Sequence, residues 1–149
     1  LVGSEMCIRD RSIGIASTEG KCLIHTGGKS NTSPWGGDSP TFMDSMAEAG
    51  KSVVDALDGN ILFISVMNNL SVDCDCTARP SAPDIHDIGI LASTDPVALD
   101  QACVDLIYQS EGAESMIRRI EGVGGEDTLE HGEEIGLGNR AYKLVVVNE

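Results

Sequence analysis

Aromatic residues are scarce in this chain of 149 residues, which contains one tryptophan, two tyrosines and two phenylalanines. Its core must therefore consist of Ile, Leu, Val, Ala and Met, which suits helices layered on a sheet better than an aromatic-rich β-sandwich. Basic residues are also few, since 10 Lys and Arg stand against 24 Asp and Glu, and the net charge is −14. We therefore expect neither nucleic acid nor an anionic membrane surface as a partner, because both require a basic face.

Long apolar stretches are missing too, since no run of about 18 apolar residues, the length that spans a bilayer, occurs in the chain. We do not expect the first residues to form a signal peptide, because charged side chains interrupt any apolar segment between Glu5 and Arg11. The five cysteines are odd in number and follow no disulfide-rich pattern, which favours a reducing compartment. We therefore expect a cytoplasmic protein with no membrane partner.

The first residues are expected to be foreign to the protein. Glu5–Arg11 resembles the translation of a transposon-adapter DNA sequence that is used to prepare sequencing libraries. We therefore predict that residues 1–11 are a sequencing artefact, that Cys7 is not biological, and that residues 12–149 form a single α/β domain. On this interpretation the domain is N-terminally truncated. It is the C-terminal part of a longer protein, and the missing N-terminal part is one of its expected partners.

Hydrophobic patterning predicts an α/β fold with a mixed or mostly parallel sheet flanked by helices. The apolar run 61–67 is typical of a strand that is buried on both faces of a parallel sheet. Further strands are expected at 12–17, 21–26, 88–93 and 142–147. Helices are expected at 40–57, 96–107, 113–120 and 128–135.

Helix-start signals precede two of these helices. Ser39 is predicted to cap the first, because Pro40 suits the first helical position. Thr94 or Asp95 is predicted to cap the second, which also begins with a proline. Cys103 falls on the apolar face of that second helix, so we expect it in the core.

Side chains that bind metals concentrate in residues 72–87, which hold two thiols, four carboxylates and one imidazole. Thiolates and imidazole are ligands for zinc and iron, and carboxylates bind harder ions or orient the softer ligands. This stretch follows the carboxyl end of the predicted strand 61–67, the edge of an open α/β sheet at which ligands bind. The predicted metal ligands are Cys74, Cys76 and His86, with Asp84 and Asp87 as supporting acids.

Other interpretations of these residues stay open. A lone Cys-x-Cys pair supplies half of a tetrahedral site, so Cys74 and Cys76 can equally be small buried thiols in a structural loop. A redox dithiol is a weaker alternative, because flanking carboxylates raise the pKa of a thiol and suppress the reactive thiolate. His86 can equally be a histidine that a loop carbonyl satisfies.

Longer motifs connect this chain to a known protein family. They are Leu70–Cys76, Asp84–Ser93, Asp95–Asp105, Leu129–His131 and Ile135–Gly138. From Gly20 to Val147 the chain resembles the carboxyl-terminal part of domain-of-unknown-function family 362, whose members are often labelled iron–sulfur centre proteins. The resemblance implies an iron–sulfur cluster, and the donor types also allow a single zinc or iron ion. Many members carry a ferredoxin-type C-x-x-C-x-x-C motif, which is absent from this chain.

A second candidate site lies at residues 25–30, where His25 precedes the letters Thr-Gly-Gly-Lys-Ser. These letters resemble a phosphate loop, but their spacing is not G-x-x-x-x-G-K-S. We therefore predict only that His25 and Lys29 can meet an anion, while the glycines serve a turn. His131 is interpreted as a helix-surface residue in an acidic patch with Glu130, Glu133 and Glu134.

These observations lead to three functional hypotheses. The first is a metal- or iron–sulfur-associated protein with redox or electron-transfer chemistry and a redox partner. The second is a noncatalytic binding module whose Cys/Asp loop is structural, either with zinc or without metal. The third is a metal-assisted enzyme that acts on a small anionic metabolite through His25 and Lys29. The sequence leaves open whether the chain is an enzyme.

Overall fold

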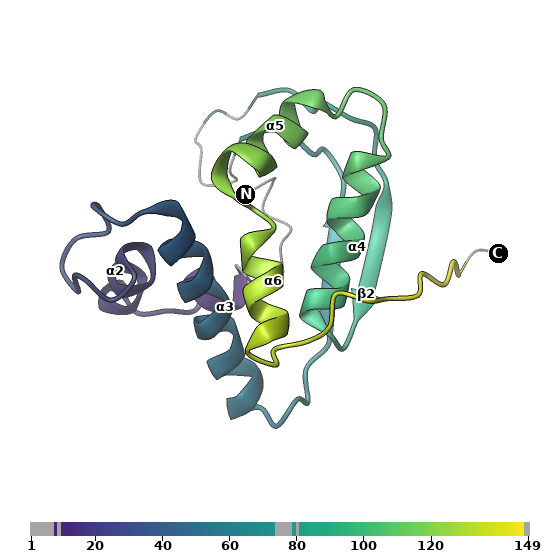
Figure 1. Cartoon of the computed structure of the whole chain (residues 1–149). Coiled ribbons are helices and arrows are strands. Elements are labelled where there is room, and N and C mark those ends of the chain that lie inside the picture. The colour runs from purple at the N-terminus through teal and green to yellow at the C-terminus, as the bar shows by residue number, and fades with distance from the viewer. Residues whose placement is uncertain (1–7, 9, 74–78, 80, 148–149) are drawn as a thin grey trace.

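The computed structural model describes residues 8, 10–73, 79 and 81–147. Within these residues the chain is mostly helical and carries one small sheet (Figure 1). The elements in chain order are the π-helix η1 (Asp10–Gly14), helices α2 (Thr18–Thr26) and α3 (Ser39–Ala56), strands β1 (Phe63–Met67) and β2 (Gly89–Ser93), and helices α4 (Pro96–Tyr108), α5 (Glu114–Val123) and α6 (Asp127–Glu134). No helix in the described part of the chain is both long and apolar enough to cross a bilayer.

The first two predicted strands are wrong, because residues 12–14 belong to η1 and residues 21–26 belong to α2. Ser17 caps α2 by accepting a hydrogen bond at 3.1 Å from the backbone amide three residues later. Gly27 ends the helix in the left-handed conformation, with φ 58°. Ile24 packs against two buried methionines of α3. A short apolar pattern such as that of residues 21–26 fits either a strand or a helix. The caps at both ends of α2 and its packing on α3 favour the helix.

The two strands pair antiparallel, in a register that sets Phe63 opposite Ser93 and Met67 opposite Gly89. For the described strands the predicted mixed or mostly parallel sheet is therefore wrong, and the α/β class holds only in the sense that helices cover a sheet. A parallel pair needs a long crossover, usually a helix, and the described residues between Met67 and Gly89 contain no helix. Burial alternates along β1, so the prediction of a strand buried on both faces is also wrong.

The last predicted strand, 142–147, does not pair with another strand in the described structure. Its apolar side chains are exposed, from 48% at Leu144 to 91% at Val147. Figure 1 shows this segment in yellow as it leaves the body of the molecule beside α4 and β2.

The four predicted helices are confirmed as α3, α4, α5 and α6, with slightly shifted ends. Asp95, one of the two predicted caps, begins α4, because its carboxylate accepts two backbone hydrogen bonds at 3.0 Å from the first turn. The cap of α3 is Asp38 and not the predicted Ser39. The Ser39 hydroxyl instead donates to the Val123 carbonyl at 2.6 Å, which joins α3 to the end of α5.

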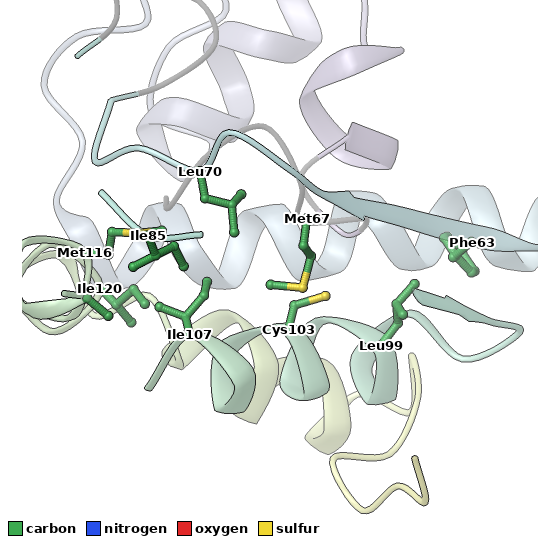
Figure 2. Close-up of a cluster of buried hydrophobic side chains, with 10 residues drawn as sticks. Phe63, Met67, Leu70, Ile85, Leu99, Cys103, Ile107, Met116 and Ile120 are labelled. Carbon is green, nitrogen blue, oxygen red and sulfur yellow. The ribbon is translucent and has the colours of Figure 1, made fainter. Parts of the chain in front are cut away.

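The main core lies between the sheet, α4 and α5 (Figure 2). It contains side chains from β1, from the segment that connects β1 to β2, from α4 and from α5 with its N-cap. These are Phe63, Met67, Leu70, Ile85, Leu99, Cys103, Ile107, Ala113, Met116 and Ile120. Cys103 is thus in the core, as predicted. Two smaller clusters lie around α3, one with α4 and α6 and one with α2. Ile8 packs in the first of these, and the foreign origin of residues 1–11 stays a prediction.

Candidate functional site

The connection between β1 and β2, residues 68–88, contains all five residues of the predicted metal site. We call residues 68–73 its outgoing limb and residues 81–88 its returning limb. Both limbs are anchored in the main core, since Leu70 is 3% exposed and Ile85 is 6% exposed. The limbs are also hydrogen-bonded to each other, because Asp84 N donates to Leu70 O at 2.9 Å and Ile88 N donates to Met67 O at 2.9 Å. The connection therefore leaves and returns at one end of the sheet with its two limbs side by side.

The two predicted supporting acids brace these limbs. Asp84 Oδ2 accepts a hydrogen bond from Val72 N at 2.9 Å, and Asp87 Oδ1 accepts one from Asn69 N at 2.9 Å. Asn69 has a positive φ of 53°, so the hydrogen bond that its amide donates to Asp87 holds a residue in an uncommon backbone conformation. One oxygen of each carboxylate thus joins the outgoing limb to the returning one. This arrangement suits acids that position a loop beside its ligands.

A third acid, Asp73, closes the loop further out. Its Oδ2 accepts hydrogen bonds from Ser81 N at 2.7 Å and from Ser81 Oγ at 2.6 Å, and we call this pair the Asp73–Ser81 clasp. The hydrogen bonds from the Ser81 side chain and backbone hold the pKa of Asp73 below its usual value, and the charge of Arg119 acts in the same direction. Sequence reasoning missed the clasp, because no local pattern links an aspartate to a serine eight positions away.

The predicted thiol ligands Cys74 and Cys76 lie outside the described residues, between the two ends of the clasp. His86 is described and is exposed, next to the buried Ile85. Among the described residues, no group of three or more His, Cys, Asp or Glu side chains could hold a metal ion. Any metal centre at this loop therefore depends on the two thiols. Among the predicted ligands that the structure describes, His86 has the imidazole nitrogen that suits zinc or iron.

The predicted anion site is divided between two sets of contacts. His25 lies in the last turn of α2, where Nδ1 donates to Lys21 O at 2.7 Å and the ring stacks on Phe42 with centroids 4.9 Å apart. Lys29 Nζ lies 3.0 Å from Asp38 Oδ2, so its charge already has an acidic partner. Neither contact favours the hypothesis of an enzyme acting on an anionic metabolite, and anion binding by these residues stays a prediction.

Asp38 is the centre of this second region. It accepts hydrogen bonds from the Thr41 hydroxyl and from Thr41 N, besides its contact with Lys29. The hydrogen bonds from Thr41 and Lys29 hold the pKa of the Asp38 carboxyl far below its usual range. Gly37, directly before it, approaches α2 so closely that a Cβ there would lie 2.1 Å from His25 O. The loop 27–38 is therefore braced against α2 at both ends.

His131 of α6 lies among carboxylates of two helices, and those of α3 were not predicted from the sequence. Its Nε2 lies 3.6 Å from Glu48 Oε1, and its Nδ1 lies 4.0 Å from Asp44 Oδ1 and 3.7 Å from Glu134 Oε2. Nε2 is buried and has no hydrogen-bond partner among the described residues. The acidic patch was expected to come from Glu130, Glu133 and Glu134 on the same helix. Two of the three carboxylates near the ring belong instead to α3. The side-by-side packing of α3 and α6 brings them there (Figure 1).

One comparison with known proteins gave a match. The family model described as a domain of unknown function (DUF362) matches residues 2–105, a range that includes η1, α2, α3, both strands, the β1–β2 connection and most of α4. The motifs at 129–131 and 135–138 lie beyond the matched range. A search of curated proteins and a search of solved structures each found no match.

Proposed function

Since the chain belongs to the family of the domain of unknown function DUF362, we propose that it is a metal- or iron–sulfur-associated protein whose β1–β2 connection carries the metal. One observation supports this proposal most. Asp73 and Ser81, which lie on either side of Cys74 and Cys76 in the sequence, are joined by the Asp73–Ser81 clasp, so the ends of the segment that contains both thiols are held together. A pre-closed loop lowers the entropic cost of bringing two ligands to one ion.

In this proposal Cys74 and Cys76 are thiolate ligands and His86 is an imidazole ligand. Asp84 and Asp87 keep the limbs in place through Val72 and Asn69, each by one carboxylate oxygen that accepts a backbone hydrogen bond. An iron centre, when bound, would supply electron-transfer chemistry. His86 is exposed, which suits exchange of electrons between that centre and a redox partner.

A structural zinc site at the same loop is the second candidate. It is favoured by the position of the loop, which joins the ends of β1 and β2, and by the antiparallel pairing of these strands. In that case the loop would clamp two strand ends in a noncatalytic binding module. Zinc and iron can be distinguished by measurement, because zinc is redox-inactive and its sites have no visible absorption.

The experiment is elemental analysis with a visible spectrum on anaerobically purified protein, beside a Cys74→Ser/Cys76→Ser double variant. Cys22→Ser is the matched control, because Cys22 is a buried free thiol on α2, outside the loop. Iron with visible absorption that is lost only in the double variant would support the proposal, whereas colourless zinc near one per chain would support the structural site. If the wild-type protein holds no metal and the double variant folds equally well, both the iron proposal and the zinc proposal are overturned.

The His86→Ala variant tests the third ligand. If His86 binds the metal, this variant should retain the thiol ligands and lose metal about 10- to 100-fold more readily to a chelator. An unchanged rate of metal loss would remove His86 from the ligand set while leaving the thiols in place.

A further inference from the structure

A cavity of about 680 Å³ lies between β2, α4 and the C-terminal segment. Its walls on the α4 side are apolar and are formed by Ala98, Leu99, Ala102 and Leu106. Residues 89–93 of β2 form a second wall, and residues 142–147 form the third. The C-terminal segment therefore faces β2 across an open space whose α4 wall is apolar.

The start of the C-terminal segment is fixed along α4. Asn139 N donates to Asp95 Oδ2 at 2.9 Å, and Arg140 Nε donates to Gln101 Oε1 at 2.7 Å. Further on, the Tyr142 hydroxyl donates to Asp105 Oδ2 at 2.7 Å. This hydrogen bond and partial burial raise the pKa of Tyr142 above its usual value. Three successive contacts thus carry the chain along α4 as far as Tyr142.

Beyond Tyr142 the segment has strand composition and no described strand partner. Residues 144–147 are Leu-Val-Val-Val, and the three valines are each at least 67% exposed. β-branched residues favour strands, and burial of such side chains is strongly favourable. Within the described structure, β2 pairs only with β1, so its other edge offers unpaired backbone groups. In the described structure, neither the segment nor this edge of β2 has a neighbouring strand to pair with, and both line the same cavity.

We propose that residues 143–147 are a strap that closes onto the free edge of β2 as a third strand and fills this cavity. Alternation of side chains along a strand gives the orientation. Because Tyr142 contacts α4, Leu144 and Val146 would also turn toward α4 and cover its apolar wall. Lys143, Val145 and Val147 would lie on the opposite face of the sheet, beside the exposed side chains of Val66 and Ile90.

Amide hydrogen exchange on the whole chain tests the strap. We expect the amides of residues 143–147 to exchange about tenfold or more slowly than in an unstructured peptide of the same sequence. Leu144→Pro should abolish this protection, because proline removes a backbone donor and Leu144 is predicted to face the cavity. Val147→Asp is the matched control, since Val147 is predicted to face away from α4, and it should retain the protection. Unchanged exchange in β1 and α3 would show that each variant is folded.

Two results would overturn the strap. One is exchange of residues 143–147 at the unstructured rate in the wild-type chain. The other is protection that appears only as the protein concentration rises, because the edge of β2 would then be occupied by the segment of a second copy.

Discussion

The carboxylate of Asp73 accepts two hydrogen bonds from Ser81, one from the backbone amide at 2.7 Å and one from the hydroxyl at 2.6 Å. These bonds close the loop that contains the predicted thiol ligands. Asp73 and Ser81, the described residues that flank this loop, are therefore held together by contacts within the chain, without a metal.

Asp73→Ala should open this clasp. We expect the Ser81 amide to exchange with solvent about tenfold faster in this variant, because the amide loses its acceptor. Ser81→Ala is the graded control, since it removes the hydroxyl donor and leaves the backbone bond in place, and it should have a smaller effect. Equal exchange in wild type and Asp73→Ala would show that the clasp does not hold the loop in solution.

Gly37→Ala should destabilise the protein through the close approach of loop 27–38 to α2. The new Cβ would lie 2.1 Å from His25 O, so the loop must move away, at a cost of about 1–3 kcal/mol in the free energy of unfolding. Gly122→Ala in α5 is the control, because a Cβ there has no other atom within 4 Å. It should be neutral or stabilise by up to about 1 kcal/mol. Urea unfolding of both variants measures the difference, and equal midpoints would contradict the prediction.

Asp95→Ala should remove the cap of α4 and one anchor of the C-terminal segment together. Asp95 accepts from two amides of α4 and from Asn139 N, so we expect a loss of about 2 kcal/mol in the free energy of unfolding. Asp95→Asn should lose less, because asparagine also caps helices well. A loss below about 0.5 kcal/mol for Asp95→Ala would indicate that water replaces these bonds at little cost.

Acid should weaken the protein partly through Asp38. The folded state lowers the pKa of this carboxyl from its ordinary value of 3.8, so the unfolded chain takes up the proton first as the pH falls. The stabilising effect of ionised Asp38 is therefore complete well above pH 4 and declines below it. We expect the difference in Tm between wild type and Asp38→Asn to shrink between pH 6 and pH 3. A difference that is constant over this range would contradict the role of the charge.

Local sequence signals predicted the helices well, because each such signal acts within a few residues. Pro96 after Asp95 places the start of α4, and the aspartate side chain caps the amides two and three positions later. The same reasoning failed at α2, where a nine-residue helix is short enough to resemble a strand. The cap of α3 was likewise predicted one position too late, at Ser39 and not at Asp38. Serine and aspartate are both good caps, so only the geometry of the turn distinguishes the two positions.

The metal site stays a prediction, and its described surroundings follow only in part from the sequence. Its donor types and its place after β1 follow from the sequence, whereas the bracing roles of Asp84 and Asp87 do not. Those roles require the two limbs of the connection to lie side by side, as the bond between Asn69 and Asp87 over 18 positions shows. The contacts of His131 with Asp44 and Glu48 likewise depend on how α3 packs against α6.

By itself, the sequence determined an acidic, aromatic-poor chain, four of its helices, two candidate caps for α4 and the stretch in which thiols, carboxylates and imidazole gather. Only the tertiary structure decided that β1 and β2 pair antiparallel, which carboxylates brace the loop and which surround His131. The physical reason is the range of the interactions. Helix caps and periodic apolar faces are set by neighbours a few positions away, whereas strand partners and carboxylate contacts are set by segments that meet when the core is packed.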